Sequence, residues 1–254
     1  MTEKTKLLNK LYIITPFKDN NLKLLKKTIK SLSNKKTNFS ILQLIIYDKS
    51  CSKLITKYKT NGKIKHNKTS YFNKFIQAKS AGIYPAINEA LNLIPVNSYY
   101  MIIGAGDLFI KIRSSLEFPE NKIIFFPYKL SNSIDNKYIK KIRSIFGGMP
   151  YCHNAIVYLN DGSKYESNYK ISADYYHFLK YIKTFNLTKQ KISQSFQESI
   201  CIEFESRYGL SSKSRISKNI ENIKIIYKFF GVAKIFLYFC HTFKKLINIF
   251  WKAN

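Results

Sequence analysis

The stretch from Ser80 to Leu91 reads SAGIYPAINEAL, and the stretch GAGDLF follows it at positions 104–109. The first stretch has the pattern of a glycine turn that opens a helix, because Gly82 allows a close approach of the backbone and Pro85 costs little in a first helical turn. The N–H groups at a helix start suit a phosphate-bearing ligand. A simple turn before a helix gives the same pattern, so this stretch alone leaves both interpretations open.

Asp107 follows an apolar run, Tyr99 to Ile103, and is reached through small residues. Small residues leave room for a diphosphate, and the carboxylate is a hard oxygen ligand for Mg²⁺ or Mn²⁺, which are typically held by one or two carboxylates and substrate phosphates. The other interpretation is an aspartate that caps a turn. The position directly after a strand makes this signal more specific than the glycine turn, but Asp107 by itself leaves both interpretations open.

Apolar runs and segments of helical period alternate around these stretches. Strands are predicted at Leu11–Thr15, Leu42–Tyr47 and Tyr99–Ile103, and helices at Leu22–Leu32 and Cys51–Tyr58. This alternation predicts an α/β fold with right-handed crossovers and a mostly parallel sheet. Because ligands bind beyond the carboxyl ends of such strands, the polar and small residues at these ends are candidate site residues.

The second half of the chain alternates less regularly. Its expected elements are strands at Lys122–Leu130 and His153–Leu159 and a helix at Ile171–Phe185, with Ser172 as the N-cap. Asp174 lies in the first turn of this helix, where a carboxylate is stabilised by the helix dipole or can serve as a general base. His153, on an apolar strand, is by itself more often a core histidine than a ligand.

The chain has 254 residues and a formal net charge of +28. This length predicts one catalytic unit with an appendage. A dense positive charge attracts nucleic acid or an anionic membrane surface, but a compositional bias toward Lys produces the same charge. The four cysteines show no CxxC spacing, which argues against both a zinc site and a disulfide framework: Cys51, Cys152, Cys201 and Cys240.

The last part of the chain is basic, because no acidic residue follows Glu221. Lysines recur there at helical spacing, large apolar residues fill the remaining positions, and Gly231 is expected to divide the segment. Such a helix lies in a membrane interface, where each lysine contributes about 1 kcal/mol at an anionic surface, or packs its apolar face on the domain. We expect a catalytic domain at residues 1–221 and a membrane-associated helical tail at residues 222–254.

The N-terminus is polar and Lys-rich and lacks the apolar core of a signal peptide. No run of about eighteen apolar residues occurs, so a spanning helix is not expected. Together with the basic tail, these features predict a cytoplasmic protein that lies peripherally on the inner face of the cell membrane.

Six stretches, in order, resemble one protein family, and they read IITPFKDN, IIYDKSCS, QAKSAGIYPAINEA, IIGAGDLF, MPYCHNA and ISADYYHF. GLSSKSRI, at positions 209–216, is a later match. The family is the family 2 glycosyltransferases of bacterial surface-polysaccharide synthesis. The resemblance implies a GT-A fold, which is Rossmann-like with a mostly parallel central sheet and flanking helices. It also implies an inverting transfer of a sugar from a nucleotide-diphosphate donor.

The matched positions carry the family's roles over to this chain. The resemblance implies that Thr15 and Pro16 line the nucleotide pocket and that Asp48 hydrogen-bonds the base. It implies that Asp107 binds Mn²⁺ or Mg²⁺ at the diphosphate and that Asp174 is the catalytic base. The other matched positions are Ser50, Gly82, Tyr84, Asn88 and Gly106 in the nucleotide-sugar site, and His153 at or near the acceptor.

Several acidic residues of the family are absent here. Ala78, Ser80, Ser52 and Pro85 stand at four of its carboxylate positions, and Glu89 replaces its usual Lys. A carboxylate near a diphosphate repels it unless a metal or proton intervenes, so these losses need not prevent donor binding. They leave open which sugar is moved. A catalytically degenerate, membrane-associated relative is therefore an alternative.

The resemblance and the basic tail together predict the partners. They are a nucleotide-sugar donor, taken as a UDP-sugar carrying a hexosyl or N-acetylhexosaminyl group, a lipid-linked glycan acceptor of O-antigen, capsule or related synthesis, and an anionic inner membrane surface. A nucleic-acid-binding protein is the alternative from another class, because basic and aromatic residues can form a stacking surface. No zinc-finger, RNP-like or helix-turn-helix signature supports it, so nucleic acid is not expected as a partner.

Overall fold

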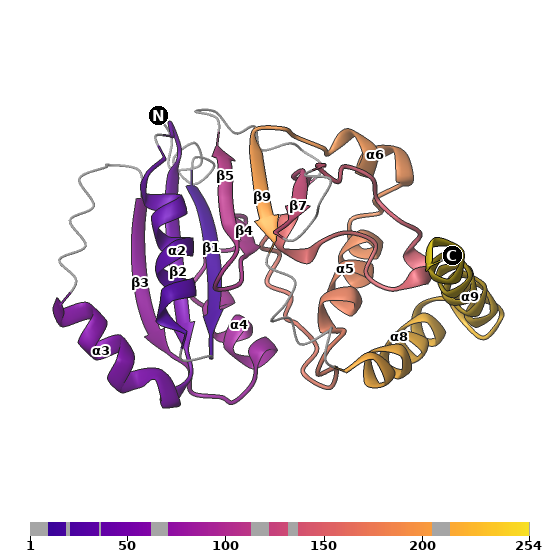
Figure 1. The fold of residues 1–254 in the computed structure, drawn as a ribbon, viewed down its shortest axis with the longest axis horizontal. Coiled ribbons are helices and arrows are strands. Elements are labelled where there is room, and N and C mark those ends of the chain that lie inside the picture. The colour runs from indigo at the N-terminus through magenta and orange to yellow at the C-terminus, as the bar shows by residue number, and fades with distance from the viewer. Residues whose placement is uncertain are drawn as a thin grey trace.

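Figure 1 shows the computed structural model, which describes residues 10–18, 21–35, 37–61, 71–112, 122–131, 137–204 and 214–253. A sheet with helices beside it forms one end of the molecule, and a smaller sheet lies in the middle. The helices α8 (Arg215–Phe230) and α9 (Ala233–Ala253) form the other end. Positions 209–213, which begin the later family match, lie outside the described residues.

Among the described residues, the main sheet has six strands in the order β3-β2-β1-β4-β8-β6. They are β1 (Lys10–Phe17), β2 (Ser40–Tyr47), β3 (Tyr71–Gln77), β4 (Tyr99–Ile102), β6 (Ile123–Phe125) and β8 (Ile156–Leu159). The first four strands in this order are parallel, and β8 runs antiparallel to both of its neighbours. The expected mostly parallel sheet is therefore confirmed. The carboxyl ends of β1 to β4 meet at one edge.

The helices of the first half follow the predicted pattern. They are α2 (Leu22–Ser33), α3 (Ser52–Asn61) and α4 (Ile83–Leu91), with a 3-10 turn, η1 (Lys49–Cys51), in front of α3. α2 begins after Asn21, whose side chain accepts a hydrogen bond from the N–H of Leu24. Its apolar face is buried through Leu25, Ile29 and Leu32, which recur at helical spacing. α4 begins with Pro85 in its first turn, as expected.

A small second sheet has the strand order β5-β9-β7. Its strands are β5 (Leu108–Ile112), β7 (Tyr128–Leu130) and β9 (Ile200–Phe204). The prediction of a single strand at 122–130 is wrong, because the chain leaves the main sheet after Phe125 and enters the small sheet at Tyr128. Pro127 lies at this crossing and has no N–H to continue a ladder. Its carbonyl accepts a hydrogen bond from the N–H of Ile202 (3.1 Å).

A 3-10 turn, η3 (His153–Ala155), precedes β8. The prediction of a strand that begins at His153 is therefore wrong for these residues, and the strand begins at Ile156. The N–H of Ala155 donates to the carbonyl of Cys152 (3.0 Å), and this local bond replaces a sheet bond. A similar turn, η2 (Ile145–Gly147), lies earlier in the same region.

The C-terminal third is helical. It contains α5 (Ala173–Thr184) and α6 (Lys189–Gln194) in addition to α8 and α9. Gly231, with a φ of 77°, lies between α8 and α9, which confirms the expected division there. The proposed domain boundary at 221/222 falls inside α8, whose Ile225 and Ile226 are buried. Within the described part of the chain, no helix is both long enough and apolar enough to cross a bilayer.

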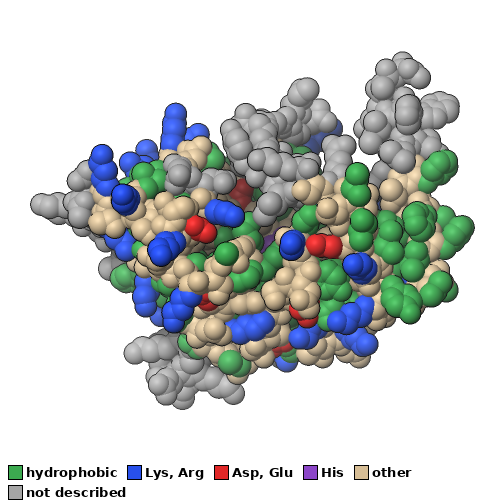
Figure 2. All heavy atoms as spheres, turned by 90° about the horizontal axis from the view of Figure 1, so that it is seen from below, with side chains coloured by type: hydrophobic (Ala, Val, Ile, Leu, Met, Phe, Trp, Pro, Cys, Tyr) green, Lys and Arg blue, Asp and Glu red, His purple; other side chains and the backbone are tan. Residues whose placement is uncertain are grey.

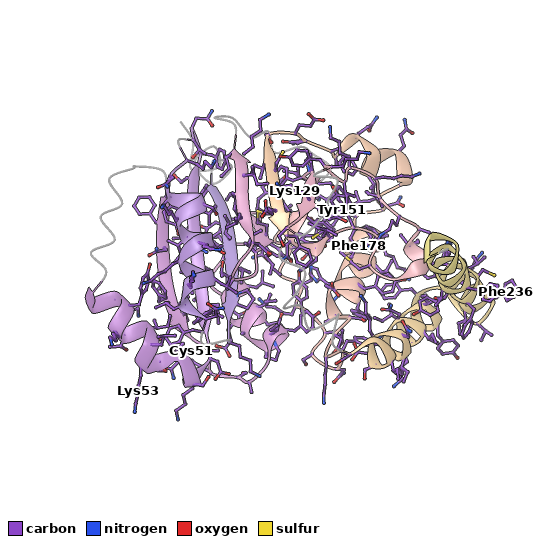
Figure 3. All side chains as sticks on the ribbon, in the orientation of Figure 1. Cys51, Lys53, Lys129, Tyr151, Phe178 and Phe236 are labelled. Carbon is purple, nitrogen blue, oxygen red and sulfur yellow. The ribbon has the colours of Figure 1, made fainter. Side chains whose placement is uncertain are left out.

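An aromatic layer fills the interior between the two sheets and α5. Figure 3 shows Tyr151 and Phe178 in this interior, and both pack edge-on against Phe125 at centroid distances of 5.5 and 6.4 Å. The hydroxyl of Tyr151 donates to the backbone carbonyls of Phe126 and Ile139 (2.8 Å each). Burial of Tyr151 is tolerated here because its polar end reaches backbone partners.

Candidate active site

A cleft opens at the carboxyl ends of β1 and β2, beside the start of α4. It encloses about 270 Å³ of empty space, part of it open to solvent. Three of the predicted nucleotide-site residues line it, namely Pro16, Asp48 and Gly82. The remaining lining residues are Phe17, Lys18, Ile46, Ala78, Ser80, Ile83 and Ala86.

Asp48 lies at the rim of this cleft, at the end of β2. The N–H of Ser50 donates to its Oδ1 (2.9 Å), and Asp48 is the N-cap of the short η1 turn. This backbone bond, helped by the Ser50 hydroxyl and the nearby charge of Lys18, holds the pKa of Asp48 below its ordinary value. The structure therefore places an ionised hydrogen-bond acceptor at the rim, with Ser50 exposed beside it.

Thr15, in contrast, is fully buried and is not among the residues that line the cleft. Its hydroxyl accepts a hydrogen bond from the side-chain amide of Gln43 (2.7 Å), and the hydroxyl of Tyr71 donates to the carbonyl of the same amide. Side chains alternate between the faces of a strand, so Thr15 and its neighbour Pro16 point in opposite directions. The structure thus places Pro16 at the cleft and Thr15 in the interior.

Glu89 closes the loop that follows β3. Its carboxylate accepts hydrogen bonds from the N–H groups of Lys79 (2.9 and 3.1 Å) and Ser80 (2.8 Å). Burial acts to raise the pKa of Glu89, but these bonds outweigh it and hold the pKa below the ordinary value. The position at which the resembled family has a Lys thus supplies the carboxylate that orders this loop. The loop itself presents Ala78 and Ser80 to the cleft.

α4 connects the cleft to a second region of the site. Its N-cap residue is Gly82, whose φ of 107° favours glycine and which lines the cleft. On the same helix, the hydroxyl of Tyr84 donates to the carbonyl of Ile171 (2.8 Å), just before α5. Burial first, and the charge of Asp174 second, raise the pKa of Tyr84 well above its ordinary value, so it remains a hydrogen-bond donor.

Asn88 faces the same second region and not the cleft. Its amide nitrogen donates to the carbonyl of Tyr165, and its amide oxygen accepts from the N–H of Tyr165, both at 2.8 Å. The ring of Tyr165 stacks between Tyr84 and His177, with centroid distances of 5.8 and 4.1 Å. The structure therefore assigns Asn88 to holding the segment that leads to α5.

Asp107 lies in a tightly bonded turn at the end of β4. It is 2% exposed, and its Oδ2 accepts hydrogen bonds from the N–H of Gly104 (2.8 Å) and from the amide of Asn154 on η3. The hydroxyl of Thr28 on α2 donates to the carbonyl of Asp107 and accepts from the N–H of Gly106, both at 2.9 Å. Gly106 has a φ of 112°, which fits the sharp turn.

The residues of this turn fit a divalent cation only in part. Among the described residues, no group of three or more His, Cys, Asp and Glu side chains converges. Asp107 supplies one carboxylate, so phosphate oxygens of a bound donor would have to supply most of the remaining ligands. A site of this kind would bind the cation together with the diphosphate of the donor. Asn154 belongs to the motif MPYCHNA, but the sequence pattern does not identify it as a site residue.

Asp174 lies in the first turn of α5 and is half-buried, and its Oδ1 accepts a hydrogen bond from the N–H of Tyr175 (2.8 Å). His153 is close to this carboxylate and has its Nε2 3.3 Å from the hydroxyl of Tyr165. Burial lowers the pKa of His153, and the charge of Asp174 acts in the opposite direction. His153 is therefore a neutral imidazole at pH 7. It is next in the chain to Asn154, so η3 contacts Asp107 through Asn154 and lies near Asp174 through His153.

Ser172 is the residue at the N-cap of α5, as expected, but its side chain makes no capping hydrogen bond. Glu221 of α8 binds the segment that leads into the helix, because its carboxylate accepts from the N–H groups of Lys170, Ile171 and Ser172. Sequence reasoning missed Glu221, and the only signal was that it is the last acidic residue of the chain.

No protein-family model and no curated protein matches this sequence. Solved structures do match its fold. Residues 1–349 of TarS from S. aureus, in complex with UDP-GlcNAc, superpose with a TM-score of 0.54 at 11% identity, over 92% of this chain and 73% of that chain. The mannosyltransferase PcManGT from Pyrobaculum calidifontis, in complex with GDP-Man and Mn²⁺, gives 0.52 at 8% identity, over 86% and 63%. The chain therefore has the GT-A fold of nucleotide-sugar glycosyltransferases, as the family resemblance predicts.

Proposed function

We propose that this protein is an inverting glycosyltransferase of family 2 that moves a sugar from a nucleotide-diphosphate donor to an acceptor hydroxyl. The observation that carries the proposal is the path of α4. Gly82 lines the cleft that holds Asp48, and Tyr84 on the same helix binds the segment that leads to Asp174. A donor pocket and a candidate base are thereby connected through one short helix, on the fold that nucleotide-sugar enzymes use.

The cleft at β1 and β2 is the proposed nucleotide site. Asp48 is an ionised acceptor at its rim and is suited to a base that presents an N–H edge, as uracil does. We take the donor as a UDP-sugar with a hexosyl or N-acetylhexosaminyl group. The matched structures hold UDP-GlcNAc in one case and GDP-Man in the other, so both nucleotides belong in the test.

Asp107 is the proposed contact to a divalent cation, Mn²⁺ or Mg²⁺, at the donor diphosphate. A cation there would supply electrophilic help to the departing nucleotide diphosphate. The N–H of Gly104 and the amide of Asn154 hold the carboxylate of Asp107 in place, and the bonds of Thr28 hold its backbone. These contacts fix the position of one carboxylate at the end of β4.

Asp174 is the proposed general base. It takes the proton of the acceptor hydroxyl while the acceptor oxygen forms its bond to the anomeric carbon and the bond from that carbon to the diphosphate oxygen breaks. The nucleotide diphosphate leaves with the electron pair of this bond, and attack from the opposite side inverts the configuration. Tyr84 and His153 lie near the carboxylate of Asp174 and are uncharged at neutral pH. Neither of them therefore forms an ion pair with it.

The acceptor proposed is a lipid-linked glycan of O-antigen, capsule or related synthesis, at the inner face of the cell membrane. An exposed apolar face on α8, α9 and the turn between them supports this, and we define it as Ile216, Ile220, Tyr227, Val232, Phe236, Phe239 and Phe243. Figure 2 shows hydrophobic side chains gathered at this end of the molecule, with basic side chains beside them. Phe236 points away from the body of the protein (Figure 3) and is 71% exposed. An exposed apolar face with basic side chains beside it suits an anionic membrane surface.

A second candidate is a catalytically degenerate, membrane-associated relative, and the near-complete burial of Asp107 favours it. The test of both is a donor screen in which release of UDP or GDP is measured with Mn²⁺, with Mg²⁺ and with a chelator. Release that depends on one donor and on the cation establishes the enzyme. Binding of UDP in calorimetry without release from any donor would support the degenerate relative.

A further inference from the structure

α5 carries Asp174, yet its start is held by a residue that lies some fifty positions later in the chain. Glu221 of α8 accepts hydrogen bonds from three successive backbone N–H groups. Its Oε1 accepts from Lys170 (2.9 Å), and its Oε2 accepts from Ile171 (3.0 Å) and Ser172 (2.7 Å). Hydrogen bonds to a carboxylate are stronger than neutral ones, and a negative charge at a helix N-terminus is favourable.

The same segment, at Ile171, also binds a second helix. The carbonyl of Ile171 accepts the hydroxyl of Tyr84 from α4 (2.8 Å), while its N–H is bound by Glu221 of α8. The segment that leads to Asp174 is therefore clamped between the helix that lines the donor cleft and a helix of the C-terminal end. Asp174 follows this clamp by two residues, and its own Oδ1 is fixed by the N–H of Tyr175 (2.8 Å).

α8 is itself firmly packed, so it can hold Glu221 in a fixed position. Ile225 and Ile226 are fully buried, and Phe229 packs edge-on against Tyr176 of α5 at a centroid distance of 5.2 Å. The Nζ of Lys228 lies 4.8 Å from the centre of the Tyr176 ring. These contacts fix Glu221 relative to α5, because both helices share the same apolar layer.

We infer that Glu221 is a positioning residue for Asp174, so that α8 belongs to the catalytic unit although the sequence places it at the edge of a tail. The inference rests on the proposed function of Asp174 as the base. A displacement of a base by about 1 Å costs up to about a hundredfold in rate. The donor cleft is built from β1, β2 and the start of α4, so its nucleotide affinity does not depend on Glu221.

The test compares Glu221→Gln and Glu221→Ala with Glu198→Gln, which removes an exposed carboxylate paired with Lys140. We expect kcat to fall by about tenfold in Glu221→Gln and by about a hundredfold in Glu221→Ala, with the dissociation constant for UDP unchanged in calorimetry. Glu198→Gln should keep both values. An unchanged kcat in Glu221→Ala, or a kcat loss that is matched by an equal loss of UDP affinity, overturns the inference.

Amide hydrogen exchange provides a readout that needs no turnover. In Glu221→Gln, which is the milder change, we expect faster exchange at residues 170–172 and at Tyr175, whose N–H reports the placement of Asp174. Protection at Tyr175 equal to that of the unaltered protein overturns the positioning role even if no donor is ever turned over. A failure of the donor screen alone would overturn the proposed function and leave this result standing.

Discussion

The two halves of the candidate site are built differently. On the donor side, Asp48 is held by the N–H of Ser50, only two residues further on, and Asp107 by the N–H of Gly104, three residues back. On the base side, the segment before Asp174 is held by Tyr84, 87 residues away, and by Glu221, about 50 residues away. Each donor-side carboxylate thus accepts a hydrogen bond from its own strand-end turn, and Asn154 and Thr28 add contacts from distant elements at Asp107. The segment before Asp174 depends on helices that are distant in sequence.

Because of this difference, we expect local substitutions to have different effects in the two halves of the site. A change on the donor side is expected to act mainly on a strand-end turn and on the ligand that this turn presents. A change on the base side alters the relation between helices, because the contacts there join α4, α5 and α8. The most informative substitutions are therefore those that affect one half and spare the other.

The largest effect is expected from Asp174→Asn. The amide keeps the size of the side chain but cannot take a proton, so turnover should fall by roughly 10²- to 10⁴-fold, while the affinity for UDP stays the same. Steady-state kinetics and calorimetry measure the two quantities. Asp161→Asn, an Asp whose Oδ1 accepts from the N–H of Ser163, is the matched control and should keep its turnover. A rate for Asp174→Asn equal to that of the control would remove Asp174 from the mechanism.

Asp107→Ala tests the donor side, and we expect a loss of turnover comparable to that of Asp174→Asn. Loss of a cation contact is worth several kcal/mol in the transition state, so turnover should fall by at least about a hundredfold. Titration of Mn²⁺ in the presence of UDP should show weaker cation binding. Asn154→Ala removes only the amide that holds this carboxylate and should give a smaller loss. Near-normal turnover of Asp107→Ala with cation present would exclude the cation contact.

Substitution of two phenylalanines on α9 tests the membrane proposal. Burial of one Phe side chain is worth about 1.5–3 kcal/mol, so Phe236→Ser combined with Phe243→Ser should lower binding to anionic vesicles by at least about tenfold. Sedimentation with vesicles rich in phosphatidylserine measures the bound fraction. Phe72→Ser is the control, because Phe72 is 55% exposed on β3, in the main sheet. Equal vesicle binding by all variants would favour a role of the apolar face other than membrane contact.

The smallest effect is expected from Glu89→Gln on the pH dependence of stability. The pKa of Glu89 is lowered in the folded protein, so its contribution to the free energy of unfolding is complete above the unfolded pKa, about 4.3, and is lost as the pH falls through the folded pKa. Denaturant unfolding at several acidic pH values should therefore show a shallower decline for Glu89→Gln than for the unaltered protein. Identical slopes would mean that the bonds to Lys79 and Ser80 do not stabilise the loop.

Much of the fold could be predicted from apolar runs and helical periods. The strands β1, β2 and β4 and the helix α2 lie where their patterns indicate, because each buries a complete face. β3 escaped prediction because polar and charged residues such as Asn73 and Lys74 interrupt its apolar pattern at the edge of the sheet. The prediction of one strand at 122–130 is wrong, because the composition of this run does not reveal that it is divided at Pro127 between two sheets.

The candidate site could be predicted only in part. Asp48, Pro16 and Gly82 were recognised from their positions at strand ends and in the glycine turn, and the structure places them in one cleft. Thr15 was assigned to the same pocket, but strand alternation turns its side chain toward Gln43 in the interior. Asn88 was assigned to the donor, yet its amide is bonded to the backbone of Tyr165. A matched motif position does not show which partner its side chain finds.

The α/β class, the parallel sheet and the polar strand ends follow from the amino-acid sequence alone, because the periods of strands and helices are local properties of the chain. The division of the region after Phe125 into two sheets, the orientation of Thr15 and the clamp of Tyr84 and Glu221 on Ile171 were decided only by the tertiary structure. Their physical reason is the same in each case. A buried backbone N–H or carbonyl must find a partner, and that partner can come from any part of the chain that packing brings near.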